Sequence, residues 1–130
     1  MNNFKRILLI DDDPIQNLIN TKLLNRIDFS ERIDVAINGK LARDEYLLSD
    51  EPLPEIIFLD INMPIMNGWE FLDMLKGMEL PHLPDVYMLT SSISPEDIRQ
   101  SDNHPMVKGY ITKPLNLDKL LEIKLSFFKD

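Results

Sequence analysis

The sequence predicts an α/β domain built on a parallel sheet with helices on both faces. Short apolar runs recur along the chain and alternate with longer segments whose apolar residues are spaced three or four apart. Several of the short runs show no polar alternation, which is typical of strands buried on both faces, as in a parallel sheet. The chain has 130 residues, no internal repeat and no low-complexity segment, so we expect a single domain over residues 1–130.

The first two strand–helix units are expected within residues 6–50. Residues 6–10 (RILLI) are rich in leucine and isoleucine and predict a buried strand. Pro14 suits the first turn of a helix, with Asp13 as its N-cap. Residues 32–37 alternate and predict a strand nearer an edge, and residues 38–50 predict a helix. In the first helix we expect Ile15, Leu18, Ile19, Leu23 and Ile27 to face inward, and Gln16, Asn17, Asn20 and Asn25 to face outward.

The third unit begins with the apolar strand 56–60, which ends in an aspartate. Residues 63–68 (MPIMNG) predict a loop in which Gly68 takes a positive φ most easily. Residues 69–78 predict the helix that follows.

The last two units show the same order of strand and helix. Strands are expected at 86–92 and 107–112, and helices at 94–100 and 113–128, the last capped by Asn116. The last helix has more apolar residues than one buried stripe needs: Leu117, Leu120, Leu121, Ile123, Leu125, Phe127 and Phe128. This excess is compatible with a partner surface or with ordinary burial of a terminal helix, and we favour burial.

Composition excludes several classes of function. A formal net charge of −8 and a pI near 4.7 argue against electrostatic binding of nucleic acid or of an anionic membrane surface. Cysteine is absent, which excludes a disulfide framework or a thiolate metal site. The first apolar run, residues 7–10, is too short for a signal peptide or a membrane span. We therefore expect a cytoplasmic protein.

Polar side chains end four of the five predicted strands. Right-handed crossovers place the carboxyl ends of parallel strands at one edge of the sheet, where open sheets bind ligands. The residues are Asp11, Asp12 and Asp13 after the first strand, Asp60 after the third, Thr90, Ser91 and Ser92 at the fourth, and Thr112 and Lys113 at the fifth.

Carboxylates gathered at one edge repel one another and attract positive charge. Two of them roughly 5 Å apart repel by about 3 kcal/mol at an effective dielectric of about 20. Such a cluster either takes up protons or binds a cation, and an all-oxygen ligand set favours Mg²⁺. A carboxylate beside Mg²⁺ and a lysine is placed to accept a phosphoryl group as an aspartyl-phosphate, and Thr90 can donate a hydrogen bond to that group.

These features together resemble the receiver domain of two-component response regulators, over essentially the whole chain. The matching segments are IDDDP (10–14), FLDINMPIMNG (58–68), LTSS (89–92) and GYITKP (109–114). The resemblance implies a doubly wound, flavodoxin-like sheet with strand order 2-1-3-4-5.

The resemblance also implies a role for each site residue. Asp60 is the expected phospho-acceptor. Asp12 is expected to bind Mg²⁺ directly, Asp11 mainly through water, and Asn62 through its backbone carbonyl. Lys113 is expected to pair with Asp60 and later with the phosphoryl group.

Further residues of the motifs are expected to act in switching. Thr90 is the expected switch hydroxyl, and Tyr110 the aromatic residue that changes rotamer with it, although Tyr110 could also be a plain core residue. Asn62 and Ser92 each lie two residues past a site residue, at places that tune the dephosphorylation rate in the family. The Lys113–Pro114 bond is expected to be cis.

The main functional hypothesis is a phosphorylation-controlled switch. A histidine kinase or phosphotransfer protein donates the phosphoryl group to Asp60, and the signal passes to an unidentified downstream protein by altered contacts. We expect no output domain and no separate enzymatic activity. Two alternatives stay open. D-x-D after an apolar strand also resembles haloacid-dehalogenase-type phosphatases, with Asp11 as nucleophile and Asp13 as acid. The chain could also be a degenerate receiver that acts only as a binding module.

Overall fold

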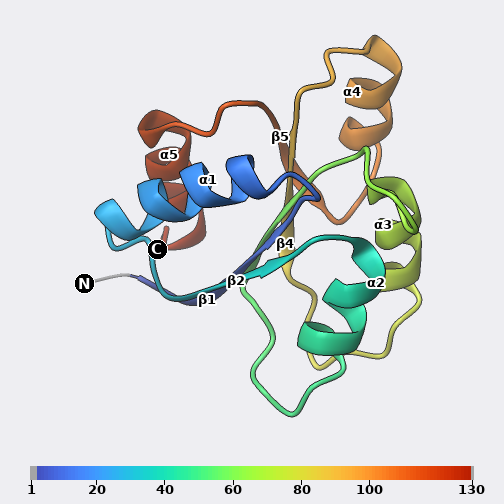
Figure 1. Cartoon of the computed structure of the whole chain (residues 1–130), viewed down its shortest axis with the longest axis horizontal. Coiled ribbons are helices and arrows are strands. Elements are labelled where there is room, and N and C mark those ends of the chain that lie inside the picture. The colour runs from blue at the N-terminus through green and yellow to red at the C-terminus, as the bar shows by residue number, and fades with distance from the viewer. Residues whose placement is uncertain (1–2, 130) are drawn as a thin grey trace.

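The structure, a computed structural model that describes residues 3–129, contains a five-stranded sheet with strand order β2-β1-β3-β4-β5 (Figure 1). All four strand pairings are parallel, so the predicted fold class and strand order are confirmed. The strands are β1 (Phe4–Ile10), β2 (Ser30–Ala36), β3 (Ile56–Leu59), β4 (Asp85–Thr90) and β5 (Val107–Thr112). The helices are α1 (Pro14–Arg26), α2 (Gly39–Leu41), the π-helix η1 (Ala42–Leu47), α3 (Gly68–Lys76), α4 (Pro95–Asp102) and α5 (Leu117–Phe127).

The core has two halves, one on each face of the sheet. Side chains alternate across a strand, so neighbouring residues of β1 and β3 serve opposite halves. Phe4, Ile7, Leu9 and Phe58 pack on the face that α1 and α5 cover. Leu8, Ile10, Ile57 and Leu59 pack on the other face, together with Phe71, Leu72 and Leu75 of α3. Within residues 3–129 no helix is both long enough and apolar enough to cross a membrane.

Helix α1 presents the opposite face from the one that its apolar spacing predicts. Asn17, Asn20 and Leu24 are its buried residues, whereas Ile15 is 66% exposed. Leu18 and Ile19 are exposed as well. The predicted inward and outward positions are therefore wrong for Ile15, Leu18, Ile19, Asn17 and Asn20. Leu23 and Ile27 are partly buried, as expected. Polar contacts at the sheet edge fix the rotation of the helix.

Hydrogen bonds at the start of α1 cap the helix and join it to the end of β1. The carboxylate of Asp13 accepts hydrogen bonds from the amides of Ile15 and Gln16, at 2.9 and 3.4 Å, which confirms the N-cap. The carboxamide Nδ2 of Asn17 donates to the backbone carbonyl of Asp11 at 2.8 Å. Asn17 can make that bond only if its face of the helix turns towards the sheet, and the isoleucines then turn outward.

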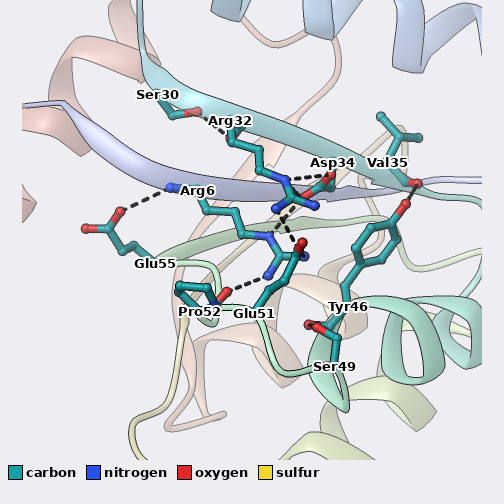
Figure 2. A network of polar contacts seen from close by, with 10 residues as sticks. All are labelled: Arg6, Ser30, Arg32, Asp34, Val35, Tyr46, Ser49, Glu51, Pro52 and Glu55. Atoms are coloured by element: carbon teal, nitrogen blue, oxygen red, sulfur yellow. Dashed lines mark hydrogen bonds and ion pairs between the residues drawn. The ribbon is translucent and has the colours of Figure 1, made fainter.

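The predicted helix 38–50 is two short pieces instead. One turn of α-helix is followed by π-helix η1, in which the amide of Leu48 donates to the carbonyl of Arg43 at 3.0 Å. The hydroxyl of Tyr46 in η1 donates to the carbonyl of Val35 in β2, at 3.1 Å (Figure 2). π-helical turns are rare, and a 3.6-residue apolar spacing does not predict them.

A buried arginine ties the following loop to the sheet (Figure 2). Arg6 is 3% exposed, and its Nε donates to Asp34 of β2 at 2.7 Å. Its guanidinium also donates to the carbonyl of Pro52 and lies 5.5 Å from the ring centroid of Tyr46. Glu51 lies 3.6 Å from Arg6 Nη2 and 2.6 Å from Arg32 Nη1. The loop before β3 is thus held by charged groups at the end of the sheet away from the aspartates.

In the loop after β3 the residue with strained backbone angles is Ile65, not Gly68. No glycine among the described residues has a positive φ, so the prediction for Gly68 is wrong, whereas Ile65 has φ 70°. Gly68 is required for space, since a Cβ there would lie 2.5 Å from the Asp60 carbonyl oxygen and 2.9 Å from Ile61 Cα. The loop therefore passes directly against the backbone of the acidic residue that ends β3.

Ile65→Asn is expected to stabilise the domain by about 1 kcal/mol. The left-handed region is an outlier for a β-branched residue, and asparagine adopts it more readily. Ile65 is exposed, so the substitution loses no packing. Urea unfolding measures the change, with Ile65→Val as the matched control because it keeps the branched Cβ. Equal stability of the two variants would contradict the strain.

Helix α5 is capped as predicted but not buried as we favoured. Asn116 accepts a hydrogen bond from the amide of Lys119 at 3.0 Å, which confirms the cap. Leu120 and Ile123 are buried. Leu117, Leu121 and Leu125 are 44, 46 and 75% exposed, and Phe127 is also exposed. Our preference for burial is therefore wrong for four of the seven apolar residues.

Candidate functional site

The carboxyl ends of β1, β3 and β5 bring three carboxylates and one lysine together. Asp11 and Asp12 follow β1 directly, Asp60 follows β3, and Lys113 follows β5. The backbone holds these ends in register, since the amide of Asp60 donates to the carbonyl of Ile10 at 3.0 Å. Residues separated by more than a hundred positions, such as Asp11 and Lys113, thus share one edge of the sheet.

Lys113 links the two buried carboxylates of the cluster. Its Nζ lies 2.7 Å from Asp11 Oδ2 and 3.1 Å from Asp60 Oδ2. The other oxygen of Asp60 accepts the amide of Ile61 at 2.8 Å, and the other oxygen of Asp11 accepts the amide of Asp13 at 2.9 Å. Both carboxylates are therefore fixed in direction by donors on each side.

Burial and charge oppose each other in this cluster. Burial raises the pKa of the Asp11 carboxyl above its ordinary value, although Lys113 and the Asp13 amide oppose the rise. Burial also disfavours the charged form of Lys113, but its contacts with Asp11 and Asp60 outweigh that effect, so the pKa of Lys113 is raised. The lysine is held as a cation, and the carboxylates would gain from further positive charge.

The residues present fit a hard divalent cation. Asp11, Asp12 and Asp60 each offer a carboxylate oxygen, and these atoms lie within 4.8 Å of one another. Asp12 is exposed, whereas Asp11 and Asp60 are buried. Such all-oxygen sets suit Mg²⁺. Asn62, two residues past Asp60, is exposed in the adjoining loop.

The hydroxyl residues at the end of β4 form a connected set. Thr90 is fully buried, and its Oγ1 accepts the amide of Ser92 at 3.3 Å. The carbonyl of Ser92 accepts the Tyr110 hydroxyl at 2.8 Å. Burial raises the pKa of the Tyr110 phenol, so its proton remains available for this bond. Ser92 therefore joins the two residues, Thr90 and Tyr110, that the motifs single out for switching.

Ser92 is also joined to helix α4. Its Oγ donates to Asp97 Oδ2 at 2.6 Å and accepts the amide of Ser94 at 3.2 Å. Ser94 is the N-cap of α4, with its Oγ accepting the amide of Asp97 at 3.4 Å. All the polar groups of Ser92 are thus engaged, and they connect Thr90, Tyr110 and the start of α4.

The sequence alone assigns no site role to Asn17 or Asp97, which lie near the site. Asn17 gave no signal, because asparagine in a helix usually faces water. Asp97 carries a partial signal, since Ser94 and Asp97 have the spacing of a capping box, but its carboxylate reaches back to Ser92 instead. For Gly68 the sequence predicts a positive φ, whereas the structure requires glycine there because the Asp60 backbone leaves no room for a Cβ. The Lys113–Pro114 bond is cis, as expected.

Comparisons with known proteins agree with this geometry. A family model described as the response regulator receiver domain matches residues 7–124. The probable methanogenesis regulatory protein FilR2 of Methanothrix harundinacea (strain 6Ac) is 32% identical over 118 residues, which cover 88% of this chain and 75% of that protein.

Solved structures give the same result. A two-component response regulator from Cytophaga hutchinsonii superposes with a TM-score of 0.82 and is 33% identical, over 96% of this chain and 99% of that one. The phosphorylated cyanobacterial phytochrome response regulator RcpA superposes with a TM-score of 0.74 and is 28% identical, over 95% and 90% of the two chains.

Proposed function

The chain belongs to the response regulator receiver domain family, whose members act as switches in two-component signalling, and from this premise we propose that Asp60 is its phospho-acceptor. The observation that carries the proposal is the pairing of Lys113 with both buried carboxylates, at 2.7 Å for Asp11 and 3.1 Å for Asp60. A lysine that contacts two carboxylates at a ligand-binding edge can hold Asp60 first and then pair with the transferred phosphoryl group.

In the proposed reaction a carboxylate oxygen of Asp60 attacks the phosphorus of a phosphohistidine on the donor. The new P–O bond forms as the P–N bond breaks, and the imidazole leaves with the bonding electron pair. Lys113 stays beside the acceptor and stabilises negative charge on the transferred oxygens. Mg²⁺, held by Asp11, Asp12, Asp60 and the backbone carbonyl of Asn62, would neutralise further charge on these oxygens.

The transferred group adds about −1.5 to −2 charge at a place where Thr90 is the nearest predicted donor. In the proposed switch the Thr90 hydroxyl turns to the phosphoryl group. The hydrogen bond from the Ser92 amide then has to change, and the contact of the Ser92 carbonyl with Tyr110 changes with it, while the Ser92 hydroxyl stays bonded to Asp97 and carries the movement to α4. This route leads from the phospho-acceptor to the start of α4.

Receiver domains work with histidine kinases or phosphotransfer proteins, and such a protein is the donor that we propose here. The output in this proposal is an altered contact with a downstream protein, in the cytoplasm, by a single domain without separate enzymatic activity. A phosphatase with Asp11 as nucleophile gains no support from the site. Asp11 is buried and ion-paired, and Asp13, the acid of that alternative, is occupied as the cap of α1.

The test is to incubate the protein with Mg²⁺ and acetyl phosphate and to measure its intact mass. We expect a single phosphoryl adduct, stable in acid and labile in base, that Asp60→Asn abolishes. Removing Mg²⁺ with EDTA should also prevent adduct formation. Steady phosphate release that depends on Asp11 but not on Asp60 would instead show a hydrolase, and neither adduct nor turnover would show a binding module.

Asp97→Ala is expected to shorten the lifetime of this adduct about fivefold. This is the effect of one new neutral hydrogen bond of about 1 kcal/mol, from the Ser92 hydroxyl to the attacking water. The Ser92 hydroxyl donates to Asp97 in the structure and is released by the substitution, so it can orient a water molecule beside the acyl phosphate. The decay is followed by intact mass after acetyl phosphate is removed.

The control for this prediction is the same substitution in a Ser92→Ala background. Without the hydroxyl, Asp97→Ala should leave the adduct lifetime unchanged, because the two residues act through one hydrogen bond. An equal effect of Asp97→Ala in both backgrounds would show that Asp97 acts on the fold of α4 and not through Ser92.

A further inference from the structure

Helix α1 buries asparagine at the end that lies next to the carboxylate cluster. Asn17 and Asn20 are 6 and 2% exposed, and only in the following turn is the buried residue a leucine, Leu24. Ile15 and Leu18 point outward instead, at 66 and 56% exposed. A partner protein that covers these two side chains would explain their exposure. It would not explain why asparagine rather than leucine faces the sheet.

The burial of these two asparagines lowers the stability of the fold. The amide oxygens Oδ1 of Asn17 and Asn20 have no hydrogen-bond partner among the described residues. Both asparagines line a small hollow together with Leu9, Phe58 and Leu89, and that hollow leaves no room for a water molecule. A buried amide oxygen without a partner is destabilising, and local costs of this kind are typical of functional positions.

The carboxamide nitrogen of Asn17 does have a partner, and that partner belongs to the site. Nδ2 donates to the backbone carbonyl of Asp11 at 2.8 Å, in a hydrogen bond that is buried. Because a carbonyl can only accept, the carboxamide has to turn its nitrogen towards Asp11 and its oxygen away. The unpaired oxygen of Asn17 is thus a consequence of its bond to Asp11.

Asp12 lies between two peptide groups that hydrogen bonds hold in place. The carbonyl of the peptide before it, that of Asp11, accepts from Asn17. The amide of the peptide after it, that of Asp13, donates to Asp11 Oδ1 at 2.9 Å. The planes of these two peptides set the φ and ψ angles of Asp12, and with them the direction in which its side chain leaves the backbone. Asn17 therefore fixes one of the two planes on which the Asp12 carboxylate depends.

The carboxylate of Asp12 lacks the restraints that hold the other two carboxylates. Asp11 and Asp60 are each held by Lys113 and by a backbone amide. Asp12 is exposed, and within residues 3–129 its side chain has neither an ion pair nor such a hydrogen bond. One of its oxygens nevertheless lies within 4.8 Å of an oxygen of each of the other two. Its place in the cluster therefore depends on its backbone.

We propose that Asn17 is a positioning residue for the divalent cation, because its bond to the Asp11 carbonyl aims the Asp12 carboxylate at the ion. The inference rests on the proposed function, in which Asp11, Asp12 and Asp60 hold Mg²⁺. A ligand that is already aimed loses less conformational freedom when the ion binds, so the affinity is higher. Loss of a hydrogen bond that orients a metal ligand lowers metal affinity by about 10–100-fold.

An NMR titration of the full chain with Mg²⁺ tests the proposal through the backbone amide peaks of the site. We expect Asn17→Leu to raise the Kd for Mg²⁺ about tenfold, because leucine has a similar shape but cannot donate to the Asp11 carbonyl. The amide peak of Asp12 should also shift before Mg²⁺ is added, since its nitrogen belongs to the peptide that loses the bond. Asn17→Ala removes the carboxamide without adding apolar bulk and should raise the Kd by a similar factor.

Asn20→Leu is the matched control. It makes the same chemical change on the same buried face of α1, where the amide oxygen also has no partner among the described residues. It should keep the Kd for Mg²⁺ within about twofold of the wild-type value. It should also raise the melting temperature by about 3 °C, because it removes an unpaired buried oxygen. Asn17→Leu should leave the melting temperature close to that of wild type, since it removes one unpaired oxygen and creates another at the Asp11 carbonyl.

Two results would overturn this inference and leave Asp60 as the acceptor, which the adduct measurement tests separately. One is a Kd for Mg²⁺ that neither Asn17 variant changes. The other is an equal rise of the Kd in Asn20→Leu, which would show that the polarity of the buried face matters and not the bond to Asp11. A wild-type protein that binds no Mg²⁺ would contradict the metal site and the role of Asn17 together. A protein that forms no adduct but loses Mg²⁺ affinity in Asn17→Leu would contradict the phospho-acceptor alone.

Discussion

Gly68→Ala is expected to destabilise the domain by about 2–3 kcal/mol, although it adds a single methyl group in a position with helical backbone. The new Cβ would lie 2.5 Å from the carbonyl oxygen of Asp60 and 2.9 Å from the Cα of Ile61. Both neighbours are backbone atoms of a buried segment, so neither can turn aside as a flexible side chain would. Overpacking of this kind costs about 1–3 kcal/mol, and here the contacts lie at its severe end.

The same substitution should also weaken the site. Relief of the contact requires the chain after β3 to move, and that segment carries Asp60 and the amide of Ile61 that holds it. We expect Gly68→Ala to lower Mg²⁺ affinity and the yield of phosphoryl adduct together with the free energy of unfolding.

Urea unfolding measures the loss of stability, and Gly77→Ala is the control. Gly77 ends helix α3 in a right-handed conformation, and a Cβ there would have no neighbour closer than 3.6 Å. Gly77→Ala should therefore change stability by no more than about 0.5 kcal/mol. Similar effects of the two substitutions would show that the loop is not packed against Asp60.

Lys113→Ala is expected to lower the free energy of unfolding by about 2–4 kcal/mol when Mg²⁺ is absent. Removing one partner of a buried ion pair leaves an uncompensated charge, and here two carboxylates, Asp11 and Asp60, lose the same cation. The expected cost is below that of a fully buried pair, because the Lys113 side chain is 13% exposed.

Added Mg²⁺ should restore part of this stability, because a bound divalent ion supplies positive charge to the same carboxylates. The measurement is urea unfolding with EDTA and then with millimolar Mg²⁺. Lys119→Ala is the control, since Lys119 is an exposed lysine of α5 whose pair with Glu122 lies on the surface. A Lys113→Ala variant that loses no more than this control, or gains no more from Mg²⁺ than wild type, would contradict the shared ion pair.

In the phosphorylated protein, Lys113→Ala should separate modification from signalling. The variant should still bind Mg²⁺ and accept a phosphoryl group, but without the change that phosphorylation brings to the β4–α4 segment. Amide hydrogen exchange of residues 90–97 reports that change. If phosphorylation leaves the amide exchange of residues 90–97 unchanged in both wild type and variant, the proposal of a phosphorylation switch is contradicted.

Much of this protein could be predicted from local sequence. The apolar runs at 6–10 and 56–60 predict the central strands, and the caps Asp13 and Asn116 predict where α1 and α5 begin. These features depend on neighbours in the chain, through hydrophobic burial of a whole run or through hydrogen bonds within one turn. The meeting of Asp11, Asp60 and Lys113 was also predictable, because parallel strands must end at one edge.

Other features were decided only by tertiary structure. The rotation of α1 depends on a hydrogen bond between Asn17 and the end of β1, which apolar spacing does not record. Gly68 is needed because a distant backbone passes close to it, and the π-helical turns at 42–47 accompany contacts of Tyr46 with β2 and Arg6. Hydrophobic periodicity sets which segments are helices and strands. The direction in which each helix faces, and the space left at each glycine, depend on atoms that only folding brings near.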